Sequence, residues 1–478
     1  MTRAEGTMTA TTPLHTDQEQ LADLLEATKR YAEQFLSTLN ERAVGAQIRE
    51  PIHQPDFPLR GIGGMATMQW FKAHYDALLS ASAGPRYLGF VTGGTTPAAL
   101  MADWLVSTFD QNAQWSGETI APFLEQQALN WLRDMLGLPD TFTGICVTGA
   151  TMANFTGLAI GRQWLGEQHG IDIAEQGLQA MRPIRVLSGS AHSSILKALA
   201  MLGIGHQQLE KLPCVGDSES VDISALRERL QQLDGEPVMV VGNAGVVNNG
   251  DFDDLKAIAS LKNQWPFWLH IDGAFGLLAG LSPRYQHLIA GTEAADSITV
   301  DGHKWLNVPY DAGYLYTRHL ASQLKVFQNV SPYLGAPVAN PLNTLHLGPE
   351  NSRRWRALPL WFSLMAYGKQ GLQHIIENDI EMAQQFAAMI DELEPYRMVV
   401  RPKLNIACFS LRESAEMNAL KALQQRLYQQ GELFVTPSSF RGTPVLRAAF
   451  SNWRTDHVDL ARIKSALLAA QLTKPEQR

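Results

Sequence analysis

Short apolar runs alternate with helix-like stretches through the middle of the chain. Five such runs contain few polar residues and are typical of strands buried on both faces; they cover residues 144–148, 184–187, 238–241, 267–271 and 297–300. Stretches such as 152–163 and 194–202 lie between them and favour helices. This repeated order of strand and helix predicts an α/β fold with a mostly parallel sheet covered by helices on both faces.

The pattern changes after a further expected strand at 313–316. Residues 353–358 lead into a long helical stretch that ends near residue 393. Three strand-like runs and two helices follow, with strands at 399–411, 433–436 and 445–450 and helices at 415–430 and 457–472. This arrangement predicts a small C-terminal α+β domain. We divide the chain into a mobile tail (1–16), an N-terminal helical segment (17–80), a large domain (81–350) and a small domain (351–478).

Composition supports a globular protein of two or three domains, because 478 residues with 45% hydrophobic side chains can bury a large core. The net charge of −8 comes from interspersed acids, and no dense basic patch favours nucleic acid as a partner. No apolar run approaches the roughly 20 residues of a membrane span. The three cysteines are widely spaced, which argues against disulfides or a zinc site and favours a reducing, cytoplasmic location.

Two segments carry the candidate chemistry. The segment HIDGAFG at 270–276 places Asp272 at the end of one buried run, and DGHKWLNVPYD at 301–311 places Lys304 just past another. In parallel sheets ligands bind at the carboxyl ends of the strands, so both side chains are expected in one pocket with Thr148 and His192. An enzyme that uses pyridoxal 5'-phosphate (PLP) needs such a pair: a lysine that binds the cofactor aldehyde and a carboxylate beside the ring nitrogen.

Both segments resemble the group II PLP-dependent amino acid decarboxylases, which include aromatic L-amino acid, glutamate and diaminobutyrate decarboxylases. The resemblance covers almost the whole chain, since several such segments occur in the order found in the family. It implies PLP fold type I, similar to aspartate aminotransferase, with a seven-stranded large-domain sheet. It also implies that Lys304 forms the internal aldimine and that Asp272 keeps the pyridine nitrogen protonated. A homodimer with the site at the subunit interface is implied too, with the helices of residues 17 to about 50 wrapping the partner.

The cofactor phosphate is expected at residues 147–154, which follow a strand and open a helix. Free backbone N–H groups and the positive end of the helix dipole favour an anion there, so Thr148, Gly149 and Ala150 form the predicted cradle. An ordinary strand-to-helix turn capped by Thr148 is the alternative interpretation. The chain departs from the Gly-Gly-Ser/Thr-Glu-Ala-Asn of the family at Ala150 and Met152. The resemblance adds His303 as a further phosphate ligand.

The resemblance also assigns two groups close to the reacting carbon. His192, in a segment similar to His-Ser-Ser, stacks on the pyridine ring and hydrogen-bonds the substrate carboxylate. Tyr333 matches the loop tyrosine that returns a proton after carbon dioxide leaves, with Lys304 as the alternative donor. Val246 stands where the family usually carries a threonine.

Four residues complete the candidate site on the substrate side. Thr92 and Gly93 lie in a glycine- and threonine-rich loop that lines the substrate entrance in the family. Arg353 and Arg447 match family positions, and either could pair with a carboxylate, although an arginine is more often structural.

These features together predict decarboxylation of an L-amino acid, with an aromatic side chain favoured, to a primary amine and carbon dioxide. Carbon–carbon lysis and oxygen-dependent oxidative deamination to an aldehyde stay open as outcomes on the same fold, and a non-catalytic homologue is the third alternative. A metal site built from His270, Asp272 and His303 lacks a spacing that completes it. The Gly-x-Gly-x-x-Gly and Gly-x-Ser-x-Gly motifs of dinucleotide-binding proteins and serine hydrolases are missing.

Overall fold

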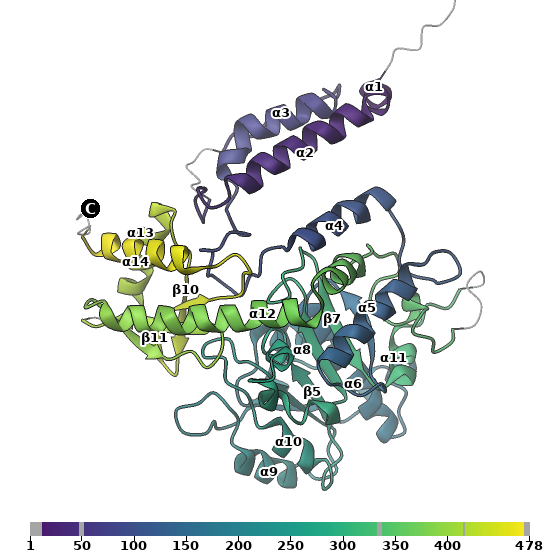
Figure 1. Cartoon of the computed structure of the whole chain (residues 1–478). Helices are drawn as coiled ribbons and strands as arrows, with labels where there is room; N and C mark the ends of the chain where they lie inside the picture. The colour runs from purple at the N-terminus through teal and green to yellow at the C-terminus, as the bar shows by residue number, and fades with distance from the viewer. Residues whose placement is uncertain (1–11, 47–51, 332–336, 414–415, 473–478) are drawn as a thin grey trace, which may run out of the picture.

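A computed structural model shows three parts: an N-terminal helical hairpin, a large α/β body and a small α+β body (Figure 1). It describes residues 12–46, 52–331, 337–413 and 416–472. The predicted fold class is confirmed, including the seven strands of the large sheet. Within the described parts, no helix is both long and apolar enough to span a bilayer.

The large sheet has the order β1-β7-β6-β5-β4-β2-β3. Its strands are β1 (Thr143–Val147), β2 (Arg185–Ser188), β3 (Leu209–Lys211), β4 (Val238–Asn243), β5 (Trp268–Asp272), β6 (Ser297–Asp301) and β7 (Gly313–Thr317). Only β7 runs against its neighbours, pairing antiparallel with both β1 and β6. The short edge strand β3 was not predicted, because its three residues are only partly buried and carry two charges.

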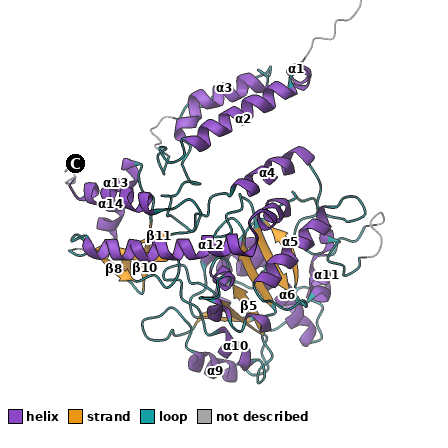
Figure 2. Ribbon diagram, viewed as in Figure 1, coloured by secondary structure: helices purple, strands orange, loops and turns teal. Residues whose placement is uncertain are grey.

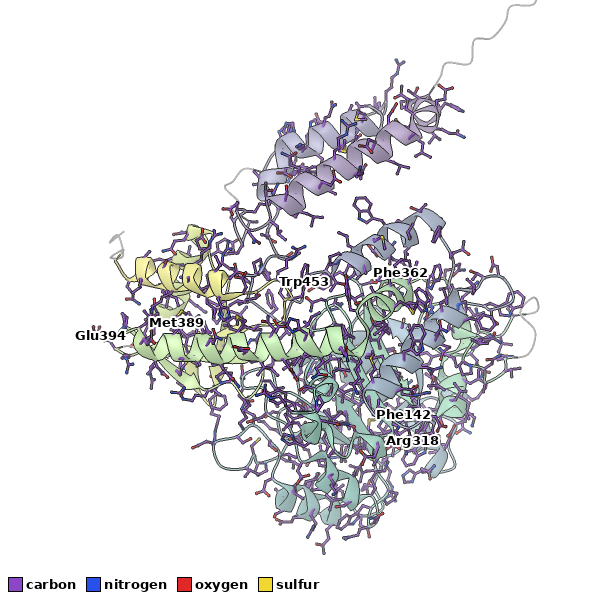
Figure 3. All side chains as sticks on the ribbon, viewed as in Figure 1. Phe142, Arg318, Phe362, Met389, Glu394 and Trp453 are labelled. Atoms are coloured by element: carbon purple, nitrogen blue, oxygen red, sulfur yellow. The ribbon has the colours of Figure 1, made fainter. Side chains whose placement is uncertain are left out.

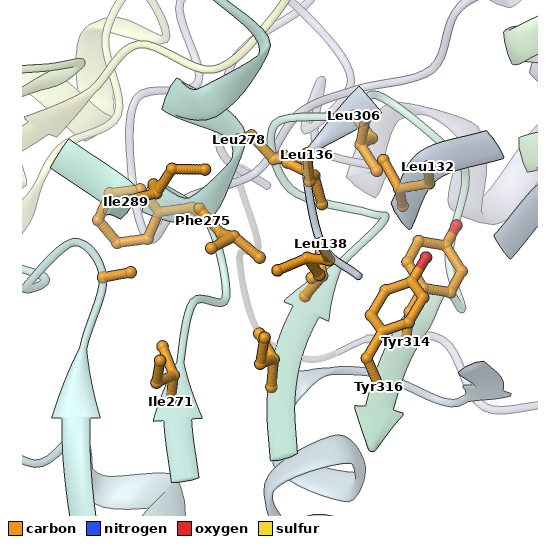
Figure 4. Close-up of a cluster of buried hydrophobic side chains, with 14 of the residues drawn as sticks. Leu132, Leu136, Leu138, Ile271, Phe275, Leu278, Ile289, Leu306, Tyr314 and Tyr316 are labelled. Atoms are coloured by element: carbon orange, nitrogen blue, oxygen red, sulfur yellow. The ribbon is translucent and has the colours of Figure 1, made fainter. Parts of the chain in front are cut away.

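Alternate residues of the central strand β4 enter different hydrophobic clusters, as the period of two in a strand requires. In β4, Val238 and Val240 join the larger cluster, whereas Met239 and Val241 join the cluster on the other face. The helices α6 (Ala150–Gln168) and α8 (Ser193–Met201) cover that second face. The larger cluster includes the side chains drawn in Figure 4 and receives α5 (Ala121–Met135), α9 (Ile223–Gln232) and α10 (Leu255–Leu261). Burial on both faces explains why the strands are almost wholly apolar.

Helix α12 (Ala357–Glu392) connects the two bodies (Figure 2). One end packs on α4 (Pro97–Phe109) and α5, and the other packs on the small sheet. Figure 3 labels Phe362 and Met389 at these opposite ends. The helix is kinked at Gly368 (φ 58°), a backbone conformation that glycine adopts without steric cost.

The small sheet has the order β10-β11-β9-β8 and is antiparallel throughout. Its strands are β8 (Tyr396–Val400), β9 (Ile406–Leu411), β10 (Thr436–Phe440) and β11 (Thr443–Ala449), with helices α13 (Met417–Gln430) and α14 (His457–Leu472). The single strand expected at 399–411 is two strands, because the chain turns between Val400 and Ile406. The strand expected at 433–436 begins only at its last residue, since Phe434 instead bridges Tyr87.

The N-terminal segment consists of α1 (Pro13–Glu19), α2 (Leu21–Ser37) and α3 (Gly64–Tyr75), which extend away from the two bodies (Figure 1). The mobile tail predicted through residue 16 is wrong for residues 13–16, which form the start of α1. Proline at the first helical position fits this start, because its missing N–H would have had no partner in the helix.

Candidate active site

A cavity of about 1350 Å³ opens at the carboxyl ends of the central strands. Most of the residues predicted for the site line it: Thr148, Gly149, Ala150, His192, Asp272, His303, Lys304 and Arg447. Asp272 is the last residue of β5 and Arg447 lies within β11 of the small sheet, whereas the others come from segments that directly follow a strand. The cavity therefore lies where the large body meets the small one, at the end of the sheet at which such folds bind ligands.

The Lys304 amine enters the cavity next to a carboxylate that sequence reasoning missed. Lys304 Nζ lies 3.6 Å from Oδ2 of Asp301, a buried residue at the end of β6. Nε2 of His303 lies 3.2 Å from the other oxygen of Asp301. The signal was available, because Asp301 is the last residue of the strand and stands three positions before Lys304.

A directed chain of hydrogen bonds ends on Asp272. The Asn154 amide donates to Asp272 Oδ2 (3.0 Å), and its own oxygen accepts from His270 Nε2 (2.9 Å). His270 Nδ1 in turn pairs with Ser297 Oγ (2.7 Å). Burial lowers the pKa of His270 to about 4, partly opposed by the nearby Asp272, so the ring is neutral at pH 7. A neutral ring that donates from Nε2 must accept at Nδ1, and this fixes the direction of the chain.

Asp272 is thereby held as a hydrogen-bond acceptor that faces the cavity. The backbone N–H of Ala274 donates to its second oxygen (3.2 Å). Two members of the network were not assigned a role from sequence: Asn154, which ends the predicted phosphate segment, and His270, which was weighed only as a metal ligand. Their positions were visible, but a hydrogen bond between residues 116 apart in sequence could not be derived from spacing.

The start of α6 forms a shallow cradle at the cavity wall. Gly149 caps the helix, and the first helical N–H groups to bond within the chain are those of Met152 and Ala153. The preceding N–H groups of the first turn are therefore free to bind an anion. A methyl group on Gly149 would lie 2.8 Å from Cε1 of His303, so only glycine allows the imidazole to approach this turn. The cradle fits a phosphate group held by backbone donors, with His303 beside it.

His192 precedes α8 and serves as its N-cap. Its Nδ1 accepts from the backbone N–H of Ser194 (3.2 Å) and lies 2.8 Å from Ser194 Oγ. Desolvation lowers the pKa of His192, while Asp272 raises it and Lys304 and Arg447 lower it further. The neutral ring, with Nδ1 engaged as an acceptor, carries its proton on Nε2. The same Ser194 hydroxyl accepts from Asn154, which connects His192 to the Asp272 network.

Of the remaining predicted residues, Thr92 lies at a smaller cavity beside Lys304, and Gly93 lies against the Lys304 backbone. Thr92 lines this space of about 380 Å³ together with Tyr87, Phe90 and Tyr310. Gly93 packs so tightly that a Cβ there would lie 1.7 Å from the Lys304 carbonyl oxygen. Gly93 therefore allows close approach of the entrance loop to the lysine turn. Tyr333 lies outside the described residues.

Arg353 requires a correction, whereas Arg447 faces the cavity. The Arg353 guanidinium is buried outside the cavity, where it is paired with Glu125 and donates to the carbonyls of Ala113 and Cys146 (3.0 Å each). Because the Arg353 guanidinium is already paired with the carboxylate of Glu125, it is not available to bind a substrate carboxylate. The expectation that Arg353 contacts the substrate is therefore wrong. Among the described residues, the Arg447 guanidinium donates hydrogen bonds to the carbonyls of Val247 and Phe90, at 3.4 and 3.2 Å.

In the described part of the chain, no group of three or more histidine, cysteine, aspartate or glutamate side chains is arranged so that it could hold a metal ion. His270 is turned into the core toward Asn154 and Ser297. Among the groups lining the cavity are the Lys304 amine, the hydrogen-bonded Asp272 carboxylate, the His192 imidazole and the anion cradle of α6.

Comparison with known proteins identifies the family to which the chain belongs. Residues 77–412 match the model of the pyridoxal-dependent decarboxylase conserved domain. The chain belongs to this family. It is a PLP-dependent carboxy-lyase acting on an amino acid, as the group II resemblance predicted.

Three relatives show how broad the family is. The chain is 29% identical to an aromatic-L-amino-acid decarboxylase of Bacillus atrophaeus over 80% of this chain and 81% of the relative. It is 30% identical to a histidine decarboxylase of Drosophila melanogaster, over 73% of this chain and 42% of that protein. A crystal structure of Oryza sativa TDC with PLP and tryptamine superimposes with a TM-score of 0.86 at 21% identity, covering 98% of this chain and 99% of that one. Relatives with different substrates share the fold, so family membership leaves the substrate open.

Proposed function

We propose that the chain decarboxylates an aromatic L-amino acid to its primary amine, with Lys304, Asp272 and His192 at the reacting centre. The observation that carries this proposal is the gathering of these three side chains in one cavity beside the anion cradle of α6. Bound PLP supplies an electron sink for the electron pair of the broken bond between Cα and the carboxylate. The chain's own residues bind the cofactor and orient the substrate.

Lys304 and Asp272 act on the cofactor. The Lys304 amine is the nucleophile that binds the cofactor aldehyde, and Thr148, Gly149, Ala150 and His303 hold the phosphate. The two oxygens of Asp272 accept from Asn154 and Ala274, which orients the side chain for its role beside the ring nitrogen.

His192 and Arg447 orient the substrate. His192 covers the ring and presents its Nε2–H to the α-carboxylate, which fixes the scissile bond for cleavage. Arg447 is the charged partner of that carboxylate, since its guanidinium faces the cavity and, among the described residues, donates hydrogen bonds to backbone carbonyls.

The preference for an aromatic side chain draws support from the smaller cavity beside Lys304. Tyr87, Phe90 and Tyr310 line it, with the Tyr310 ring 4.4 Å from the ring of His303. Aromatic walls favour an aromatic substrate by edge and stacking contacts worth roughly 1 kcal/mol each. The aromatic relative from Bacillus atrophaeus points the same way.

A panel of amino acids tests the proposed reaction. Tyrosine, tryptophan, phenylalanine, histidine, glutamate and 2,4-diaminobutyrate are each incubated with the PLP-loaded enzyme while carbon dioxide, amine, aldehyde and peroxide are followed. We expect equal amounts of carbon dioxide and amine from an aromatic substrate. Aldehyde with peroxide would show oxidative deamination instead, and fastest turnover of glutamate or diaminobutyrate would refute the aromatic assignment.

Tyr333→Phe tests the proposed proton donor. If the Tyr333 hydroxyl delivers the proton that replaces the carboxylate at Cα, we expect amine formation to slow by roughly a hundredfold, as is typical for loss of a general acid. Carbon dioxide release should persist in part, with more aldehyde or pyridoxamine phosphate formed. Product analysis by chromatography provides the measurement. An unchanged amine yield and rate would assign the proton to Lys304 or His192.

We further propose that the enzyme is a cytoplasmic homodimer in which the helices of residues 17 to about 50 wrap the partner subunit. The exposed apolar side chains of this segment, which include Leu21 and Leu25, support a covering surface. The three cysteines are free in the structure, consistent with a reducing compartment.

A further inference from the structure

Asp379 is a fully buried acid in the middle of the connecting helix α12. Its Oδ2 accepts a hydrogen bond of 2.8 Å from the indole N–H of Trp305. Its Oδ1 has no hydrogen-bond partner within the described residues. The functional site described above makes no use of this acid, although Trp305 is the residue directly after Lys304.

Burying this carboxyl is costly, which makes its presence informative. The side chains around it belong to an apolar cluster that includes Trp305, Ile376, Ile380 and Leu404. Burial raises the pKa of Asp379 to about 8, and the bond from Trp305 offsets only part of that rise. The group is therefore mostly a neutral carboxylic acid at pH 7, which asparagine can imitate in both shape and charge.

The turn that carries Lys304 is tied down on its other sides by backbone-directed bonds. The Asn307 amide donates to the carbonyls of Trp305 (2.9 Å) and Ser451 (3.0 Å). The Asn307 backbone N–H donates to the Lys304 carbonyl (3.2 Å), and the Asn307 side-chain oxygen accepts from the backbone N–H of Trp453 (3.0 Å). These contacts fix the backbone, but none of them holds the Trp305 side chain.

Asp379 supplies that missing contact from a different element. Helix α12 packs on the large body at one end and on the small sheet at the other (Figure 3). An indole held by a hydrogen bond has one allowed orientation, and its backbone shares a peptide plane with the Lys304 carbonyl. A small rotation of Trp305 would therefore move the origin of the Lys304 side chain, and displacements of about 1 Å at a reacting group can cost roughly a hundredfold in rate.

We propose that Asp379 is a positioning residue for Lys304, acting by accepting the Trp305 indole N–H and so fixing the turn from which the lysine enters the cavity. This inference rests on the role proposed for Lys304. It adds that α12 helps to determine where the amine lies.

The test compares Asp379→Asn, Asp379→Leu and Trp305→Phe. Asparagine keeps an acceptor oxygen for the indole, leucine removes it, and phenylalanine removes the donor while keeping a ring. Cofactor-free protein is titrated with PLP by absorbance, and kcat and KM are then measured on the loaded enzyme. We expect PLP affinity and kcat to fall about tenfold or more in the leucine and phenylalanine variants, with KM within about twofold. The asparagine variant should retain both values within about twofold.

Ile390→Ala is the matched control, because Ile390 is buried in the same helix but packs in the small-body core away from the lysine turn. It should lower the melting temperature without changing PLP affinity. The double variant Asp379→Leu/Trp305→Phe should be no worse than the poorer single variant, because both partners of one bond are removed. If Asp379→Leu does not fold, Trp305→Phe decides the matter.

Three outcomes would overturn the inference. These are full PLP affinity and kcat in Trp305→Phe or Asp379→Leu, an asparagine variant as impaired as the leucine variant, or equal losses in Ile390→Ala at a matched melting temperature. Failure of the Lys304 assignment would be distinguishable, because borohydride would then attach the cofactor to a different lysine in the wild-type enzyme.

Discussion

Lys304→Ala should yield a folded, colourless protein that has lost turnover by roughly ten-thousandfold or more, the scale seen when a covalent nucleophile is removed. Without the amine, the cofactor aldehyde has no covalent partner in the cavity, and the phosphate contacts alone must retain it. The melting temperature should change little, because the ion pair of the Lys304 amine in the described structure is the 3.6 Å contact with Asp301. Absorbance in the violet and turnover of the best substrate are the measurements.

Lys304→Arg is the control for charge. It keeps a cation beside the buried Asp301 but cannot form the bond to the aldehyde, so it should be as inactive as the alanine variant. Activity in the arginine variant above about a tenth of wild type would show that Lys304 contributes only charge. Another lysine would then have to hold the cofactor.

Asp272→Asn should lower kcat by roughly a hundredfold or more while the cofactor stays bound. Asparagine keeps the shape of the side chain but removes the charge that stabilises a protonated ring nitrogen. Its amide would also face the Asn154 amide, which now donates to Asp272 Oδ2 at 3.0 Å. Stopped-flow absorbance and steady-state turnover measure the effect, and PLP titration verifies that binding persists.

Asp296→Asn is the matched control for Asp272→Asn, because it also removes a buried carboxylate, but at the opposite end of the sheet. Asp296 precedes β6 and pairs with Lys262 and His319, far from the carboxyl ends of the strands. Its replacement should cost stability without affecting the chemical step. Near wild-type turnover in Asp272→Asn, or an equal rate loss in Asp296→Asn, would contradict the electronic role of Asp272.

The sequence alone predicted the large sheet well, because its strands are buried on both faces and are therefore almost wholly apolar. The same periodicity located Asp272 and Lys304 at strand ends, where side chains from distant segments meet. It failed in the small sheet, where the run 399–411 contains a turn that no glycine marks, and at β3, whose three residues are too short and polar for a pattern.

The contacts behind the site could not be predicted in the same way. Asn154 and His270 act through hydrogen bonds that join segments more than a hundred residues apart, and Asp379 meets Trp305 from the distant helix α12. Arg353 matched the family position yet is buried against Glu125. Residue type and spacing show which groups can do chemistry, whereas the fold decides which of them face the cavity.

Reductive trapping of the wild-type enzyme tests the central claim most directly. Borohydride is added to the PLP-loaded protein, which is then digested, and the modified peptide is sequenced by mass spectrometry. We expect loss of the yellow colour and one phosphopyridoxyl group per chain, attached to Lys304. Attachment to any other lysine, or no attachment under conditions in which the enzyme turns over, would contradict the assignment of this cavity as the cofactor site.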